Sequence, residues 1–237
     1  VSAKEMAFSI INDYHSYDNI SVLYNESGNT YYIKFYQTIR DILDSNGYTK
    51  VNYIKFAENA EQNYNQYVLQ AVAIQPKLII ILDSDVGTGL LAQNIKKHDN
   101  KVALIGCEAA ITPRLIEIGG ASVENMRFVS TINLDINDPQ VTKFNRAYET
   151  LYGTEPNPYA YFGYLSAQTI INAGKGCNFN KKRLKESMLN LKDPKIKSEL
   201  LFNKFGDVEN LPVTIIIKDG SFEKLGFLNN AKKKNKS

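Results

Sequence analysis

The 237-residue sequence contains no tryptophan, only two cysteines and only two histidines. Two cysteines, Cys107 and Cys177, provide neither a metal site by themselves nor a disulfide framework. Cys107 follows an apolar run, and we expect it to pack as a small apolar residue. A disulfide between the two cysteines in an oxidising compartment is left open. Neither His15 nor His98 has a partner at the spacing of a catalytic or zinc site, so we predict no catalytic residue, metal or cofactor.

The sequence also lacks long apolar runs and strong charge. No apolar segment approaches the roughly 20 residues that span a membrane. The net charge is only +3, and much of it lies in the lysines of the last residues, 229–237, which we expect to be a disordered basic tail. No other region is densely basic, which argues against nucleic-acid binding. The chain opens on Val1 without a signal peptide, and a processed or shortened chain is left open.

The most informative stretch runs from residue 78 to residue 108. Residues 78–82 are all apolar, as in a strand that is buried on both faces of a parallel sheet. A helix follows that Gly87-Thr88-Gly89 opens, and residues 102–105 form the next strand. Polar side chains directly follow both strands. Because ligands of open α/β sheets bind beyond the carboxyl ends of the strands, we predict a binding crevice there.

Strands and helices alternate regularly through the first part of the chain, which predicts a doubly wound parallel sheet. The expected strands are 20–24, 51–56, 78–82, 102–105 and 126–131. The expected helices are 1–14, 31–45, 64–72, 87–100 and 112–118. In the second of these helices, the apolar face is predicted to contain Ile33, Tyr36, Ile39 and Leu43.

The pattern changes after residue 138. Three helices are expected without strands between them, at 138–151, 159–173 and 180–191. In the first, the inward residues are predicted to be Val141, Phe144, Tyr148 and Leu151. Residues 213–217 and the turn Lys218-Asp219-Gly220-Ser221 then predict a β-hairpin.

An ordered set of segments gives the chain a family resemblance. The set is Tyr24-Asn25-Glu26-Ser27, LIIILDSD, ALIGCE, ASVENMRFVST, DPQVTKFNRAYETLYGTEPNPYAYFGYLSAQTI and FNKFGDVENLPVTIIIKDGSFEKLG. It resembles the type I periplasmic binding proteins, and more narrowly the branched-chain amino-acid (Leu/Ile/Val) binding proteins of ABC importers. The resemblance covers residues 1 to about 226.

The resemblance implies two α/β lobes that close on a ligand like a hinge. Residues 1–132 would form the ligand-binding lobe, residues 133–205 would be helices of a second, incomplete lobe, and residues 206–228 would be crossing strands that return to the first lobe. Family members begin with a further segment that supplies the sheet of the other lobe. Helices without that sheet would expose apolar surface, so we expect the missing N-terminal segment to be supplied from elsewhere.

The resemblance also implies site residues. Glu108 matches the position whose carboxylate accepts the ligand ammonium, and its place after a buried strand agrees; the alternative is a loop acid that caps the following helix. Ser84 and Asp85 fall where an aromatic side chain often touches the ligand. Two acids near one ammonium would suit a more cationic, polyamine-like ligand, and helix capping is the alternative role.

Three further positions are weaker candidates for ligand contact. Asn29 and Thr30 occupy a loop where the family often has a tyrosine facing the cleft, and the alternative is that they cap the helix at Tyr31. Tyr161 begins the long helix near the expected hinge, and the alternative is a place in the core.

The function that we predict is a non-catalytic, periplasmic or extracellular solute-binding protein, with a membrane anchor left open. It would bind a small amino-acid-like ligand and present its closed form to an ABC permease. The first alternative is the ligand-sensing extracellular domain of a receptor or histidine kinase. The second is an NAD-dependent enzyme, because Gly87-Thr88-Gly89-Leu90-Leu91-Ala92 fits G-x-G-x-x-A and Glu108 follows about 20 residues later.

Overall fold

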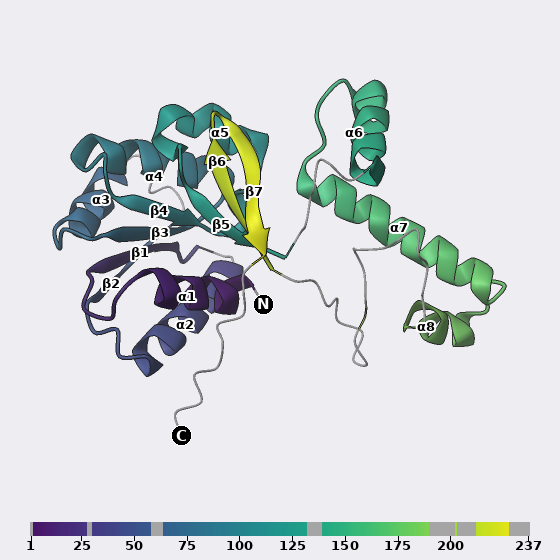
Figure 1. Cartoon of the computed structure of the whole chain (residues 1–237), viewed down its shortest axis with the longest axis horizontal. Helices are drawn as coiled ribbons and strands as arrows, with labels where there is room; N and C mark the ends of the chain where they lie inside the picture. The colour runs from purple at the N-terminus through teal and green to yellow at the C-terminus, as the bar shows by residue number, and fades with distance from the viewer. Residues whose placement is uncertain are drawn as a thin grey trace. The chain divides into compact units, whose positions relative to one another are not determined.

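The computed structural model describes residues 2–27, 30–57, 64–131, 139–189, 202 and 212–227. The chain divides into two compact units. Unit 1 contains residues 1–131 and 212–237, and unit 2 contains residues 132–211. Figure 1 shows both units.

Unit 1 is built on a seven-stranded sheet with the strand order β2-β1-β3-β4-β5-β6-β7. Strands β1 to β5 are parallel, and β6 and β7 run antiparallel to their neighbours. The strands are β1 (Ile20–Asn25), β2 (Val51–Phe56), β3 (Leu78–Leu82), β4 (Ala103–Gly106), β5 (Arg127–Ser130), β6 (Val213–Lys218) and β7 (Ser221–Phe227).

Helices cover both faces of this sheet, as Figure 1 shows. Helices α1 (Ser2–Asp13) and α2 (Thr30–Ser45) pack on one face. Helices α3 (Tyr64–Val72), α4 (Asp85–His98) and α5 (Pro113–Gly119) pack on the other. Two short 3₁₀ helices, η2 (Glu108–Ala110) and η3 (Gly120–Val123), flank α5. The predicted α/β class and the doubly wound parallel sheet are therefore confirmed.

Strand β3 shows why the sequence has a continuous apolar run. Successive side chains of a strand point to opposite faces. Leu78, Ile80 and Leu82 pack against α1 and α2. Ile79 and Ile81 pack into the core under α3, α4 and α5. All five side chains are fully buried, because helices cover both faces of this central strand.

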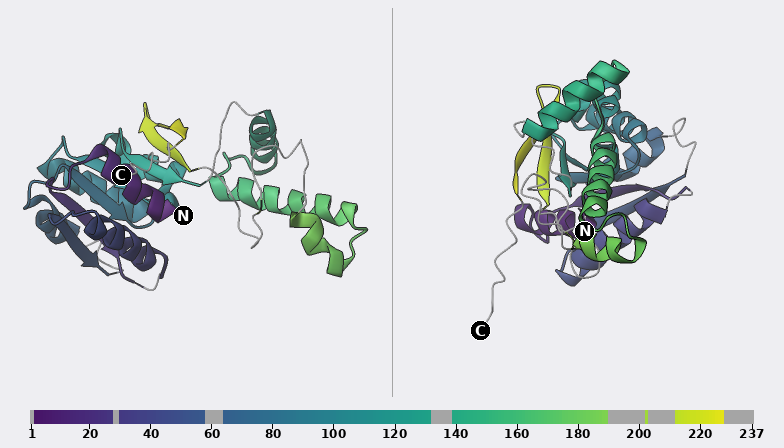
Figure 2. Two further views of the ribbon diagram at one scale, coloured as in Figure 1. Left: turned by 60° about the horizontal axis from the view of Figure 1, so that its bottom comes forward. Right: turned by 90° about the vertical axis from the view of Figure 1, so that its right-hand side faces the viewer.

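Strands β6 and β7 form the predicted hairpin and extend the sheet beside β5 (Figure 2). The turn residues Asp219 and Gly220 have φ values of 49° and 69°. Two consecutive positive φ values belong to the type I′ turn, whose twist matches that of the flanking strands. Ser130 pairs with Val213, so the hairpin starts at the edge of the sheet where the parallel strands end.

Unit 2 contains the helices α6 (Pro139–Tyr152), α7 (Pro158–Gly176) and α8 (Lys181–Leu189). The side chain of Asn157 caps α7 by accepting a 2.9 Å hydrogen bond from the N–H of Ala160. A small core joins α6 and α7, and it consists of Val141, Tyr161 and Leu165 with Phe144 packed against it.

Three details of the sequence prediction are wrong. Leu151 is 75% exposed, because the described core contacts of α6 involve Val141 and Phe144 in its first half. In α2 the buried residues are Tyr32, Phe35, Ile39 and Leu43, and Tyr36 packs partly buried against the same core, so the predicted face omitted Tyr32 and Phe35. Helix α4 begins at Asp85, two residues before Gly87, because Ser84 already caps it.

Candidate functional site

The carboxyl ends of four parallel strands place polar side chains along one edge of the unit 1 sheet. Tyr24 pairs with Leu82, Ile81 with Gly106, and Gly106 with Phe128, so β1, β3, β4 and β5 end side by side. Figure 1 shows the arrowheads of these strands on the same side of the sheet. Asn25 and Ser130 are the last residues of β1 and β5, Asp83 directly follows β3, and Glu108 is the second residue after β4.

Glu108 is the best-anchored carboxylate of this edge. Its Oε1 atom accepts hydrogen bonds from the Ser130 hydroxyl at 2.7 Å, from the Thr131 N–H at 2.8 Å and from the Thr131 hydroxyl at 3.2 Å. Its Oε2 atom accepts a hydrogen bond from the Ser2 hydroxyl at 2.7 Å. The side chain is therefore held by the end of β5 and by the start of α1, while the residue itself is only half-buried.

Asp83 is the second carboxylate of this edge that accepts several hydrogen bonds, and it is only 3% exposed. Its Oδ1 atom accepts bonds from the side-chain amide of Asn25 at 3.0 Å and from the N–H of Ser84 at 2.8 Å. Its Oδ2 atom accepts a bond from the Tyr64 hydroxyl at 3.4 Å. A buried carboxylate requires such donors. Asp83 therefore joins the ends of β1 and β3 to α3.

Ser84 and Asp85 lie at the start of α4, next to Asp83. The Ser84 hydroxyl accepts a 3.3 Å hydrogen bond from the N–H of Gly87, which is a helix N-cap. The carboxylate of Asp85 accepts bonds from the Val86 N–H at 2.8 Å and from the Thr112 hydroxyl at 2.7 Å. Since η2 packs against α4, Asp85 and Glu108 belong to neighbouring segments of the same edge.

The remaining predicted positions are not brought to this cluster by any described contact. Thr30 is exposed and is the first residue of α2. Asn29 lies outside the described residues. Tyr161 belongs to unit 2 and is 2% exposed, with its ring packed against Phe144 at a centroid distance of 5.1 Å.

Sequence reasoning missed the groups that position Glu108. Ser130 and Thr131 carried one signal, since they are hydroxyl residues at the carboxyl end of a strand. Ser2 carried none, because it is 106 residues away in the sequence. From the sequence, Asp83 is only one of the polar side chains that follow the strand of residues 78–82, although in the structure it is the most buried acid of the edge.

The sequence profile of the family described as "Periplasmic binding protein" matches residues 21–222, which is most of the chain. The chain belongs to the periplasmic binding protein family. This confirms the predicted resemblance. No curated protein matches the chain.

Solved structures show the same fold in proteins of this family. LivK, a leucine-binding protein of Thermotoga maritima, is 20% identical with a TM-score of 0.80 over 97% of this chain and 65% of that one. LivJ of Streptococcus pneumoniae, solved with isoleucine, is 15% identical with a TM-score of 0.75 over 95% and 64%. A solute-binding protein of an ABC transporter from R. palustris, solved with benzoate, is 12% identical with a TM-score of 0.79 over 95% and 62%. The chain thus spans less than two thirds of the length of these three proteins.

The glycines that suggested a dinucleotide site have another role in this binding protein. Gly87 and Gly89 lie inside helix α4 and not in the turn before it. A Cβ atom on Gly87 would lie 1.9 Å from Oδ2 of Asp83, and one on Gly89 would lie 2.8 Å from the side chain of Ile118. Close packing within the protein therefore explains both glycines. The G-x-G-x-x-A fingerprint needs its first glycines in the turn, next to a pyrophosphate.

Cysteine and metal chemistry are not part of the described site. Both cysteines are free thiols. Cys107 is buried at the end of β4, and burial raises the pKa of its thiol to about 12, so the thiol is neutral at physiological pH. Within the described ranges, no group of three His, Cys, Asp or Glu side chains could hold a metal ion. Among the helices that the structure describes, none has the length and apolarity of a membrane span.

Proposed function

We propose that the protein is an extracytoplasmic solute-binding protein that binds a small amino-acid-like ligand between two lobes for an ABC importer. The observation that carries this proposal is the Glu108 carboxylate, held by Ser2, Ser130 and Thr131 at the carboxyl edge of a parallel sheet. Ligands of open α/β sheets bind at such an edge. The family membership supports the same function.

In this proposal Glu108 accepts the ammonium group of the ligand. Its Oε1 atom accepts hydrogen bonds from Ser130 and Thr131, and its Oε2 atom accepts one from Ser2. A charge-assisted hydrogen bond from an ammonium group to this carboxylate would be stronger than a bond between neutral groups and would select for a cation. The fixed donors on Oε1 would keep the carboxylate oriented before the ligand arrives, which lowers the cost of binding.

Asp85 and Ser84 supply the finer specificity in this proposal. Asp85 is only half-buried, and it begins the helix that packs against η2. With Glu108 it provides two carboxylates and no aromatic side chain, which favours a ligand with more positive charge than leucine has. The proteins with this fold differ in their ligands, since LivJ was solved with isoleucine and the R. palustris protein with benzoate. Thr30, Asn29 and Tyr161 remain weaker candidates for ligand contact.

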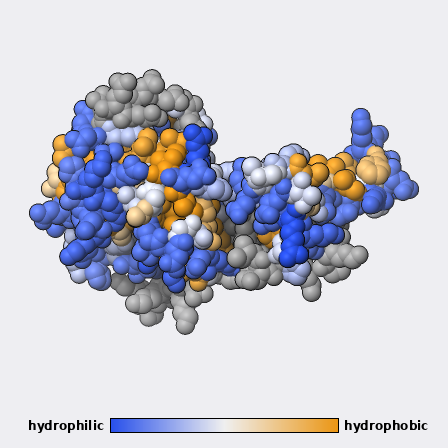
Figure 3. Space-filling view, turned by 90° about the horizontal axis from the view of Figure 1, so that it is seen from above, coloured by the Kyte–Doolittle hydropathy of each residue, from blue (hydrophilic) through white to orange (hydrophobic). Residues whose placement is uncertain are grey.

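We assign residues 1–132 and the strands of 206–228 to one lobe and residues 133–205 to the other. Apolar side chains at the surface of unit 2 support the idea that a further segment completes the second lobe. The exposed side chains are Leu151, Tyr152, Tyr159, Tyr164, Ile170, Ile171 and Phe179. Figure 3 shows apolar surface over the helices of unit 2, at its right. Exposed apolar patches of this kind usually mark an interface.

The proposal contains no catalytic step, because its carboxylates act as hydrogen-bond acceptors for the ligand. Binding would shift an equilibrium between open and closed lobes. The partner would recognise the closed form, and we assign that role to an ABC permease. An extracellular sensing domain would use the same ligand-binding step.

The test is isothermal titration calorimetry on the intact protein with leucine, isoleucine, spermidine, benzoate and NAD. We expect saturable binding of one ammonium-bearing compound and no binding of NAD. Glu108→Ala should weaken that binding at least about tenfold, which corresponds to about 1.4 kcal/mol. The control is Glu117→Ala, because Glu117 is an exposed acid on α5.

Two results would contradict the proposal. Unchanged affinity in a folded Glu108→Ala variant would remove Glu108 from the binding site. Binding of NAD alone would overturn the solute-binding function itself.

A further inference from the structure

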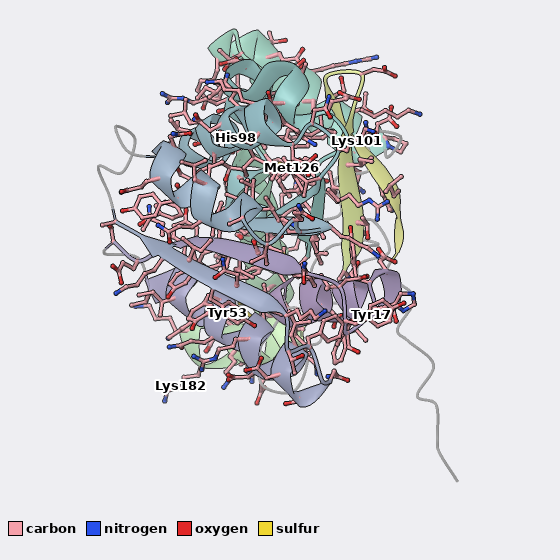
Figure 4. All side chains as sticks on the ribbon, turned by 90° about the vertical axis from the view of Figure 1, so that its left-hand side faces the viewer. Tyr17, Tyr53, His98, Lys101, Met126 and Lys182 are labelled. Atoms are coloured by element: carbon pink, nitrogen blue, oxygen red, sulfur yellow. The ribbon has the colours of Figure 1, made fainter. Side chains whose placement is uncertain are left out.

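A concave site lies at the opposite edge of the unit 1 sheet, where the parallel strands begin. It is a groove of about 570 Å³, which is a volume typical of small-molecule sites. The last turn of α4, the start of β4, the turn after η3 and Tyr14, which follows α1, surround it. Figure 4 shows this side of the molecule, with Lys101 and Met126 labelled. Strand β4 separates the groove from Glu108, which follows its other end.

The groove exists because β4 and β5 diverge. These strands pair only at Ile105 with Arg127 and at Gly106 with Phe128. The residues just before β5 form hydrogen bonds with β6 instead. The N–H of Asn125 donates to the carbonyl of Ile217 in β6 at 2.8 Å. The described part of β4 that precedes Ile105 therefore has no strand partner on its β5 side. A wedge-shaped space opens there.

Positive charge dominates the lining of this space. Three cations, Lys96, Lys101 and Arg127, line the groove together with one carboxylate, that of Glu124. The Glu124 carboxylate is already engaged, since it accepts hydrogen bonds from the N–H groups of Asp219 at 2.9 Å and Gly220 at 3.4 Å. The remaining electrostatic environment favours an anion.

The three cations remain available to an anion to different degrees. Arg127 pairs with Asp13 at 3.2 Å, but both side chains are nearly half exposed, and such surface pairs contribute little. Lys101 is exposed, and no hydrogen bond or ion pair of its side chain is among the described contacts. The side chains of Arg127 and Lys101 can therefore bind a ligand without losing a strong interaction.

Lys96 is the cation that would gain most from an anion. Its ammonium donates to the carbonyl oxygens of Val102 at 2.7 Å and Asn100 at 3.1 Å. No acidic group lies within ion-pair distance of it in the described part of the chain. Partial burial lowers the pKa of Lys96, because the charged form loses solvation there. An anion in the groove would offset this loss.

We propose that this groove binds a small anionic molecule through a phosphate or carboxylate group held by Lys96, Lys101 and Arg127. Lysine ammonium groups bind such oxygen anions as point charges, and arginine adds a planar pair of donors. Tyr14 also lines the groove, and in this proposal its aromatic side chain contacts the remainder of the ligand. The site is separate from the edge at which the amino-acid-like ligand is proposed to bind.

The test is a titration of the ¹⁵N-labelled chain with sodium phosphate and, separately, sodium succinate, followed by amide chemical shifts at constant ionic strength. We expect saturable shifts at residues 101–104 and 125–127 with at least one of the two anions. Phosphate alone would identify a phosphate-bearing ligand, and succinate alone a carboxylate.

Lys101→Gln should weaken this binding about fivefold, as expected for the removal of one nearby charge. Lys97→Gln is the matched control, because Lys97 is the exposed neighbour of Lys96 on α4 and does not line the groove. Arg127→Gln is a second variant that keeps the test usable if the first does not fold. Shifts that rise linearly with both anions, or that both Lys101→Gln and Arg127→Gln leave unchanged, would overturn the proposal.

Discussion

The carboxylate of Glu108 accepts a 2.8 Å hydrogen bond from the N–H of Thr131, the residue at which the first stretch of unit 1 ends. The Ser130 hydroxyl binds the same carboxylate oxygen. The Glu108 side chain therefore holds the end of β5, after which the chain continues into unit 2. In the proposed function the same carboxylate meets the ligand, so the binding group and the exit of the chain are physically joined.

The anchoring role of Glu108 predicts an effect on stability that does not depend on any ligand. Glu108→Ala removes the acceptor for Ser2, Ser130 and Thr131, and Ser130 is only 1% exposed. The loss of these hydrogen bonds to a charged acceptor should cost about 1–3 kcal/mol in total. Urea denaturation should show that loss in the free energy of unfolding. Glu117→Ala should leave it nearly unchanged, and equal stability of the two variants would argue against the anchoring role.

The contact between Gly87 and Asp83 predicts opposite effects for two glycine-to-alanine changes. Gly87→Ala places a methyl group against the buried Asp83 carboxylate, and such overpacking costs about 1–3 kcal/mol. Gly163 lies in helix α7 with no atom within 4 Å of an added Cβ. Gly163→Ala should therefore stabilise the protein by about 0.5–1 kcal/mol through helix propensity.

Thermal denaturation of both glycine variants measures these effects. If Gly87→Ala were as stabilising as Gly163→Ala, the packing explanation for Gly87 would fail. The glycine would then need another reason, such as close approach of a ligand.

The ion pair of Asp18 and Lys77 predicts a pH-dependent contribution to stability. Lys77 Nζ lies 2.7 Å from Asp18 Oδ1, and the N–H of His15 donates to Asp18 Oδ2 at 2.9 Å. The hydrogen bond from Lys77 holds the pKa of Asp18 below its usual value. The stabilisation is therefore present above the unfolded pKa of about 3.9 and is lost as the pH falls through the lower, folded pKa.

Asp18→Asn tests this contribution. The variant should be less stable than the parent protein at neutral pH, and the difference should shrink as the pH falls below about 3.9 and then through the lower pKa of the folded state. Urea denaturation at neutral pH and at a series of acidic pH values measures it. Asp44→Asn, on the exposed side of α2, serves as the control. A destabilisation of Asp18→Asn that is independent of pH would assign the effect to packing and not to charge.

Local patterns were sufficient to predict the elements of this protein. The apolar run of residues 78–82 predicted a central strand, because a strand covered on both faces needs apolar side chains at every position. Asp219-Gly220 predicted the hairpin, because the type I′ turn needs two positive φ values. Leu151 shows the limit of such patterns, since periodicity identifies a helix face but not how far along the helix a partner covers it.

The candidate site was predicted only in part. Glu108 stood out because a single acid followed a buried strand. The partners that orient it did not, because Ser2 and Ser130 are brought to Glu108 by the order of strands in the sheet and by the packing of α1. The sequence suggested a dinucleotide site at Gly87 and Gly89 because their spacing fits the fingerprint. Their close contacts with Asp83 and Ile118 become visible only in the folded structure.

The alternation of strands and helices, the α/β class and the position of Glu108 after a strand could all be predicted from the order of the residues. These features depend on hydrophobic period and turn chemistry, which are local. The folded structure was needed to show which groups hold Glu108, why Gly87 is a glycine, and where β4 and β5 diverge to open a basic groove. Those features depend on contacts between residues that are far apart in the chain, and only the packed sheet brings them together.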